Sequence, residues 1–63
     1  MKWELYEVWS VDPDGHESLV DTTKDLKEAR TMAKQALTEG AIQCIIYRET
    51  ADGDLAVFEK LPL

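Results

Sequence analysis

The segment Asp12–Glu17 has the sequence DPDGHE, which gathers carboxylates and one imidazole within a few residues. A calcium-binding loop would need a further run of oxygen ligands and a closing Glu at its twelfth position, where Thr23 stands. The first four residues are instead typical of a β-turn, because Pro13 presets φ at the second position and Gly15 accepts a positive φ. We therefore expect a hairpin turn here, and we predict neither a metal site nor a cofactor.

Nucleophilic catalysis has one candidate pair, Cys44 with His16, the only cysteine and the only histidine of the chain. Cys44 lies in an apolar, strand-like run, where a buried thiol is usually an inert packing group. The three glycines are isolated, so the sequence holds no glycine-rich phosphate loop. A domain this small also has little room for a substrate pocket unless a dimer creates one. The sequence predicts that the protein is not an enzyme.

Size and charge restrict the function classes further. The 63 residues form one expected domain, 1–63, with a net charge of −6 and a pI near 4.5. This charge argues against binding to a nucleic-acid backbone. No apolar run approaches the roughly 20 residues of a membrane span, and Glu4 and Glu7 interrupt the first residues, unlike a secretory signal. A single cysteine and the lack of a signal-like start favour the cytoplasm. We therefore expect a cytoplasmic protein that binds neither nucleic acid nor membrane.

One helix is expected over Thr22–Glu39. Its apolar residues recur at helical spacing and form a narrow, alanine-rich stripe. Thr22 or Thr23 is the expected N-cap, and Gly40 is the expected residue after the C-cap. A stripe of small side chains lets a helix lie close to a sheet. The stripe consists of Leu26, Ala29, Ala33, Ala36 and Leu37.

Four strands surround this helix in the sequence: Lys2–Val11, His16–Asp21, Ala41–Glu49 and Leu55–Leu61. Glycine-containing turns join the first two strands and the last two, so the expected order is ββαββ. We predict an α+β two-layer sandwich, in which a four-stranded antiparallel sheet carries the helix on one face. The strand order 2-1-3-4 keeps all neighbours antiparallel. An arrangement that gives the fourth strand to a partner chain is an alternative.

Alternation along the strands divides the side chains between two faces. If each turn is type I with a bulge, Trp9 lies opposite Leu19 and Val8 opposite Val20. By the same register, Tyr47 lies opposite Val57 and Ile46 opposite Phe58. The face for the helix then contains Tyr6, Val8, Val20, Ile42, Cys44, Ile46, Ala56 and Phe58. The other contains Trp3, Leu5, Trp9, Leu19, Ile45, Tyr47, Leu55, Val57 and Leu61, with Glu7 and Asp21 among them.

The second face is too apolar for the solvated back of a sheet. We predict a small interaction module that forms a homodimer, or binds a protein partner, through this face. The expected interface residues are Trp3, Leu5, Trp9, Leu19, Ile45, Tyr47 and Val57. Two alternatives stay open: the aromatic residues only cover the sheet of a monomer, or the apolar face holds a small ligand.

A third hypothesis concerns the acidic residues. An acidic inhibitor would imitate nucleic acid toward a basic protein, using the carboxylates Glu4, Glu7, Asp12, Asp14, Glu17 and Asp21. Sheets that bind RNA also display aromatic residues, but they are surrounded by basic side chains, which this sequence does not supply.

Overall fold

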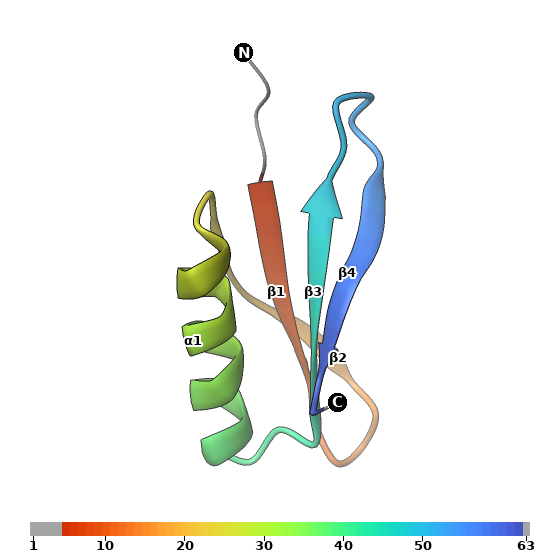
Figure 1. Cartoon of the computed structure of the whole chain (residues 1–63). Helices are drawn as coiled ribbons and strands as arrows, with labels where there is room; N and C mark the ends of the chain where they lie inside the picture. The colour runs from red at the N-terminus through yellow and green to blue at the C-terminus, as the bar shows by residue number, and fades with distance from the viewer. Residues whose placement is uncertain (1–4, 63) are drawn as a thin grey trace.

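A computed structural model describes residues 5–62, and it contains a four-stranded antiparallel sheet with one helix on one face. The strands are β1 (Leu5–Val11), β2 (Glu17–Thr23), β3 (Gln43–Glu49) and β4 (Leu55–Leu61), and the helix is α1 (Leu26–Thr38). The sheet order is β2-β1-β3-β4, with α1 beside the sheet (Figure 1). The predicted two-layer α+β sandwich and its strand order are confirmed, and β4 pairs with β3 of the same chain.

Both hairpins use the predicted turn. Gly15 donates its backbone N–H to the carbonyl of Asp12 at 2.9 Å, and Asp12 donates to the carbonyl of His16 at 3.0 Å. The second turn repeats both bonds, from Gly53 to Thr50 and from Thr50 to Asp54. Gly15 and Gly53 have φ values of 89° and 88°, which glycine adopts without the strain that a Cβ atom would cause. The two turns therefore set the same register at the start of both hairpins.

A bulge changes that register farther from each turn. The pairs Trp9–Leu19 and Tyr47–Val57 form as predicted. Beyond them, Val8 pairs with Asp21 rather than with Val20, and Ile46 pairs with Glu59 rather than with Phe58. The extra residues are Val20 and Phe58. A bulge of this kind sets two residues of one strand against one of its neighbour.

The bulges also move residues between the faces, because paired residues share a face. Asp21 and Leu61, which we expected on the back of the sheet, pair with Val8 and Cys44 on the helix side. Leu61 packs against the core there. Lys60 moves the other way and pairs with Ile45 on the back.

The two hairpins are related by an approximate two-fold axis through the Val8–Ile46 pair. Around this pair, Trp9 of β1 lies opposite Ile45 of β3, and Glu7 lies opposite Tyr47. The turn bonds and the bulges recur at equivalent positions of the two hairpins. The fold thus contains a structural repeat, although the sequence contains no repeat.

The helix begins later than predicted. Strand β2 continues to Thr23, which pairs with Tyr6. Neither Thr22 nor Thr23 is therefore the N-cap. Asp25 is the N-cap, and its carboxylate accepts the backbone N–H of Lys27 at 3.0 Å. Gly40 follows the helix with a φ of 117°, at the predicted position.

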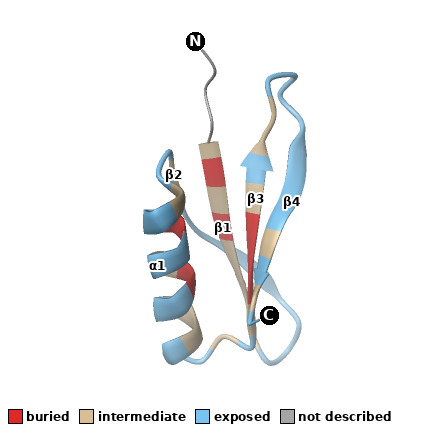
Figure 2. Cartoon of the chain, viewed as in Figure 1, coloured by how far each residue is buried: buried red, intermediate tan, exposed pale blue. Residues whose placement is uncertain are grey.

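A small core lies between α1 and the sheet. Its buried residues are Tyr6, Val8, Ala29, Ala33, Cys44 and Ile46. The helix packs on β1, β3 and β2, whereas β4 is exposed along most of its length (Figure 2). The Arg30 guanidinium reaches across to β4, where it forms an ion pair with Glu59 at 2.9 Å. The helix therefore covers one face of the sheet only in part, and no described element covers the other.

Candidate interaction surface

The back of the sheet forms a continuous apolar surface, which we call the open sheet face. It consists of Leu5, Trp9, Leu19, Ile45, Tyr47, Leu55 and Val57. Strand pairing places these side chains together: Leu19, Trp9 and Ile45 form one row across the sheet, and Tyr47 and Val57 belong to the next. Six of the seven predicted interface residues thus share a face, and the seventh, Trp3, lies outside the described residues.

Exposure within this surface rises from the centre to the edge strands. Ile45, on the inner strand β3, keeps only 8% of its surface exposed. Leu19 on β2 and Leu55 and Val57 on β4 are 50%, 49% and 54% exposed. Large apolar side chains exposed on an uncovered sheet are typical of a protein–protein contact.

Two aromatic side chains form the centre of the open sheet face. The rings of Trp9 and Tyr47 meet edge to face, with centroids 6.4 Å apart and planes at 86°. The Trp9 indole Nε1–H donates to the Glu7 carboxylate at 3.0 Å. The polar atom of the tryptophan is thus satisfied within the chain. A shallow hollow of about 380 Å³ lies beside this pair, between Trp9, Tyr47, Glu17 and Leu55.

Charged residues lie among the apolar ones. By strand pairing, Glu7, Glu17 and Glu49 occupy the back of the sheet, together with Lys60. Sequence reasoning missed Lys60 on this face, because its position depends on the bulge at Phe58. With three carboxylates and one ammonium group among these residues, the back of the sheet is acidic on balance.

The DPDGHE segment is a turn that satisfies its own carboxylate. One oxygen of Asp12 accepts the backbone N–H groups of Asp14 and His16, at 3.0 and 2.9 Å. The other lies 3.9 Å from the exposed His16 imidazole. Within residues 5–62, no group of three or more His, Cys, Asp or Glu side chains is placed to hold a metal ion.

The two residues of the candidate nucleophilic pair, Cys44 and His16, lie in different environments. Cys44 is fully buried and its thiol donates to the carbonyl of Ala33 at 3.3 Å, whereas His16 lies exposed at the turn. Burial raises the pKa of the Cys44 thiol above its ordinary value of 9.0, which lowers the thiolate fraction at neutral pH. Burial and the raised pKa both make the Cys44 thiol a weak nucleophile at neutral pH.

The described carboxylates of the inhibitor hypothesis are divided between the two faces of the sheet and the first turn; Glu17 shares the back of the sheet with Glu7. Glu7 lies on the open sheet face and Asp21 pairs with Val8 on the helix side, while Asp12 is engaged in its turn. Glu4 lies outside the described residues.

Over residues 5–62, no helix combines the length and the apolar character needed to cross a membrane. The chain matches no protein-family model, no curated protein and no solved structure.

Proposed function

We propose that the protein is a small, non-catalytic interaction module that forms a homodimer through the open sheet face. The observation that carries the proposal is the continuous apolar surface around Trp9 and Tyr47, which no described element covers. Antiparallel sheets that stay in water on one side alternate polar residues outward. Here the outward positions of β1, β3 and β4 carry Trp9, Ile45, Tyr47 and Val57 instead.

The size of this surface supports a dimer. Four strands about 4.8 Å apart, each with 7 residues rising about 3.3 Å, give the sheet a flat area of roughly 440 Å². Two copies packed face to face would bury roughly twice that, before the relief of the side chains is counted. Specific interfaces need about 1,000 Å² in total. The flat area of such a pair, roughly 880 Å², lies just below this figure, and the relief of the side chains brings it to the low end of specific interfaces, as for a weak, reversible dimer.

A small core gives a further reason to associate. A chain of about 60 residues buries only about 60% of its unfolded surface and is marginally stable alone. Its one cysteine excludes a disulfide within the chain. Burial of half-exposed side chains such as Leu19 and Val57 in a dimer would add about 25 cal/mol for each Å² of apolar surface removed from water.

The test is sedimentation equilibrium of the wild type and three lysine variants at neutral pH. Trp9→Lys and Val57→Lys place a charge on the open sheet face; Val57 is 54% exposed, so the monomer should tolerate this change. Ile42→Lys is the matched control, because Ile42 is 56% exposed and lies outside that face. All three variants lower the net negative charge of the chain equally, so general repulsion between copies falls equally.

We expect the wild type and Ile42→Lys to dimerise at low micromolar concentration, and the two open-face variants to dissociate at least ten times more readily. Circular dichroism should show unchanged helix in Val57→Lys. A wild type that stays monomeric up to millimolar concentration contradicts the proposal. Dimerisation of Val57→Lys with the affinity of the wild type contradicts it as well.

A further inference from the structure

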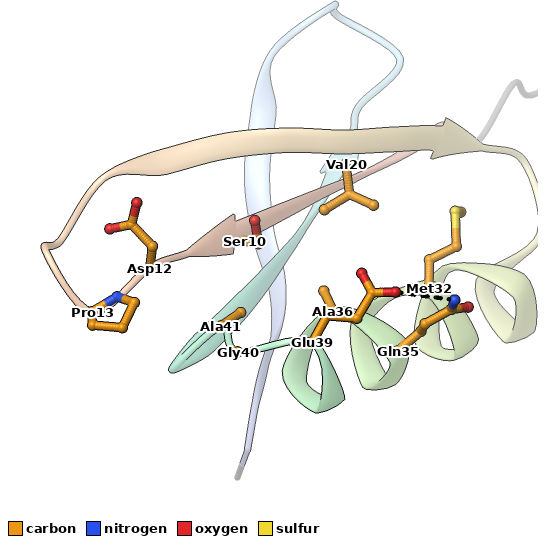
Figure 3. A pocket seen from close by; sticks show the side chains of 10 residues that line it. All are labelled: Ser10, Asp12, Pro13, Val20, Met32, Gln35, Ala36, Glu39, Gly40 and Ala41. Atoms are coloured by element: carbon orange, nitrogen blue, oxygen red, sulfur yellow. Dashed lines mark hydrogen bonds between the residues drawn. The ribbon is translucent and has the colours of Figure 1, made fainter.

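A second surface, on the helix side, is a groove between α1 and β2. We call it the helix–strand groove, and its volume is about 560 Å³ (Figure 3). It lies on the side of the sheet opposite the open sheet face, so a face-to-face dimer would leave it free. The residues that line it are Ser10, Asp12, Pro13, Val20, Met32, Gln35, Ala36, Glu39, Gly40 and Ala41.

The groove exists because small residues face a bulged strand. Ala36 and Ala41 have short side chains that do not fill the space below β2. Val20 is the extra residue of the β2 bulge, and it points from the strand toward the helix (Figure 3). Met32 faces it from α1. Val20 stays 41% exposed, so the apolar wall has room for another side chain.

The end of the groove next to the last turn of α1 and the β1–β2 turn is negatively charged. Of the ten described residues that line it, none is basic, and two are the carboxylates Glu39 and Asp12. Within residues 5–62, the Glu39 carboxylate accepts one side-chain hydrogen bond, a long one of 3.4 Å from the Gln35 amide. The carbonyl end of α1 lies at the same place, and the last turn of the helix has no basic residue. The backbone N–H groups of Glu39, Gly40 and Ala41 already bond the carbonyls of that turn, so the Glu39 carboxylate is the main negative group there.

The edge of β2 is poorly suited to the addition of another strand. The bulge at Val20 interrupts its regular spacing, and the Asp21 carboxylate accepts the backbone N–H of Thr22 at 2.8 Å. Bulges and charged side chains are features that prevent edge-to-edge pairing. A partner at this side of the molecule would therefore bind through its side chains.

We propose that the helix–strand groove binds a short cationic segment of another protein. An apolar side chain of that segment would lie between Val20 and Met32. A Lys or Arg next to it would lie at Glu39 and the carbonyl end of α1. The choice of occupant rests on charge complementarity: the groove pairs an apolar wall with a negative end, and the whole chain carries a net charge of −6.

The probe is a blocked heptapeptide with the sequence Gly-Ser-Arg-Leu-Lys-Ser-Gly. One control peptide replaces Leu by Ser, and a second replaces Arg and Lys by Glu. Chemical-shift changes of the ¹⁵N-labelled full chain would locate binding and give its affinity. We expect shifts concentrated at Val20, Met32 and Glu39, a dissociation constant between tens and hundreds of micromolar, and binding at least five times weaker for either control peptide. Binding should also weaken at higher salt concentration.

Two matched variants test the charged end. Glu39→Gln removes the carboxylate of the C-cap residue of α1 and Glu28→Gln removes one in its first turn, and only Glu39 lines the groove. We expect Glu39→Gln to weaken binding three- to tenfold and Glu28→Gln to change it less than twofold. Val20→Lys adds a cation to the exposed apolar wall and should abolish binding without loss of the fold.

Three results would each overturn the proposal. One is equal weakening by Glu39→Gln and Glu28→Gln, which would mean that only the net charge matters. Another is equal binding of the Leu and Ser peptides, which would mean that the apolar wall has no role. The third is a set of shifts on the open sheet face. The first two results leave the proposed dimer untouched; the third would show the peptide at the proposed dimer interface, and sedimentation equilibrium without peptide then tests dimerisation separately.

Discussion

Replacement of Ile46 by Ala tests whether the core lies where the strand pairing places it. Ile46 is fully buried at the centre of the sheet, where it pairs with Val8 and packs below Ala29 and Ala33. The change removes three carbon atoms. At about 0.8 kcal/mol for each buried methylene, the transfer contribution is about 2.4 kcal/mol. The cavity that remains raises the expected loss to about 3–4 kcal/mol, within the usual range for such changes.

This loss is large for a chain of this size. At roughly 0.05–0.15 kcal/mol per residue, a domain of 63 residues is stable by about 3–9 kcal/mol. Ile46→Ala therefore removes between a third and all of the free energy of unfolding. Urea denaturation, followed by far-UV circular dichroism at one protein concentration, measures the effect. With a urea dependence of about 1 kcal/mol/M, the midpoint should fall by about 3 M.

The matched control is Ile42→Ala, because Ile42 is 56% exposed. The same substitution there should cost no more than about 0.5 kcal/mol. If Ile46→Ala does not fold, Ile46→Val should still fold and lose about 0.5–1.5 kcal/mol. Costs for Ile46→Ala and Ile42→Ala that agree within 0.5 kcal/mol would refute the assignment of the core.

Three further predictions concern the start of the helix and the buried thiol. Asp25→Ala should lower the free energy of unfolding by about 1 kcal/mol, because the Lys27 backbone N–H loses its acceptor, whereas Asp52→Ala in the exposed second turn should have little effect on the urea midpoint. Cys44 should react with iodoacetamide about 100-fold more slowly in the native chain than in urea, because reaction requires opening of the core. Burial raises the pKa of Cys44 above 9.0, so the unfolded chain loses this proton first, and stability should fall as the pH rises above about 9. Equal alkylation rates would show that Cys44 is accessible.

The sequence predicts the elements of this fold well because each has a local physical cause. Gly15 and Gly53 take the positive φ that both turns need, and the turns fix the pairs Trp9–Leu19 and Tyr47–Val57. The alanine-rich stripe requires a helix that packs closely on a sheet. Short connections between the hairpin strands and a longer one through the helix leave few strand orders open.

The bulges could not be predicted, because they have no required residue type. Val20 and Phe58 are ordinary strand residues, and the competition between two registers depends on packing over the whole sheet. The face of every residue beyond a bulge changes with it, as the positions of Asp21, Lys60 and Leu61 show. The N-cap was misplaced for a related reason: sheet pairing with Tyr6 extends β2 to Thr23, which takes precedence over the capping preference of a threonine.

The candidate surfaces differ in how far the sequence could reveal them. Period-two alternation finds the open sheet face, since Trp9, Ile45 and Tyr47 share one side whether or not the strands continue past the bulges. The helix–strand groove is invisible at that level. It requires the bulge that exposes Val20, and the position of that bulge depends on packing over the whole sheet.

One helix cannot cover a four-stranded sheet, and this geometric fact underlies both proposals. A helix is about 10 Å wide with its side chains, whereas four strands span roughly 19 Å. The helix packs on β1, β3 and β2, so β4 and the whole back of the sheet stay open. The acidic charge of the chain gives the two proposed contacts opposite dependence on salt concentration. Because the back of the sheet carries more carboxylates than ammonium groups, two copies would repel each other in the proposed dimer, so added salt should favour their association. A cationic segment is attracted to the helix–strand groove, so added salt should weaken its binding. Opposite salt dependence is therefore the property that would distinguish the two contacts in one sample.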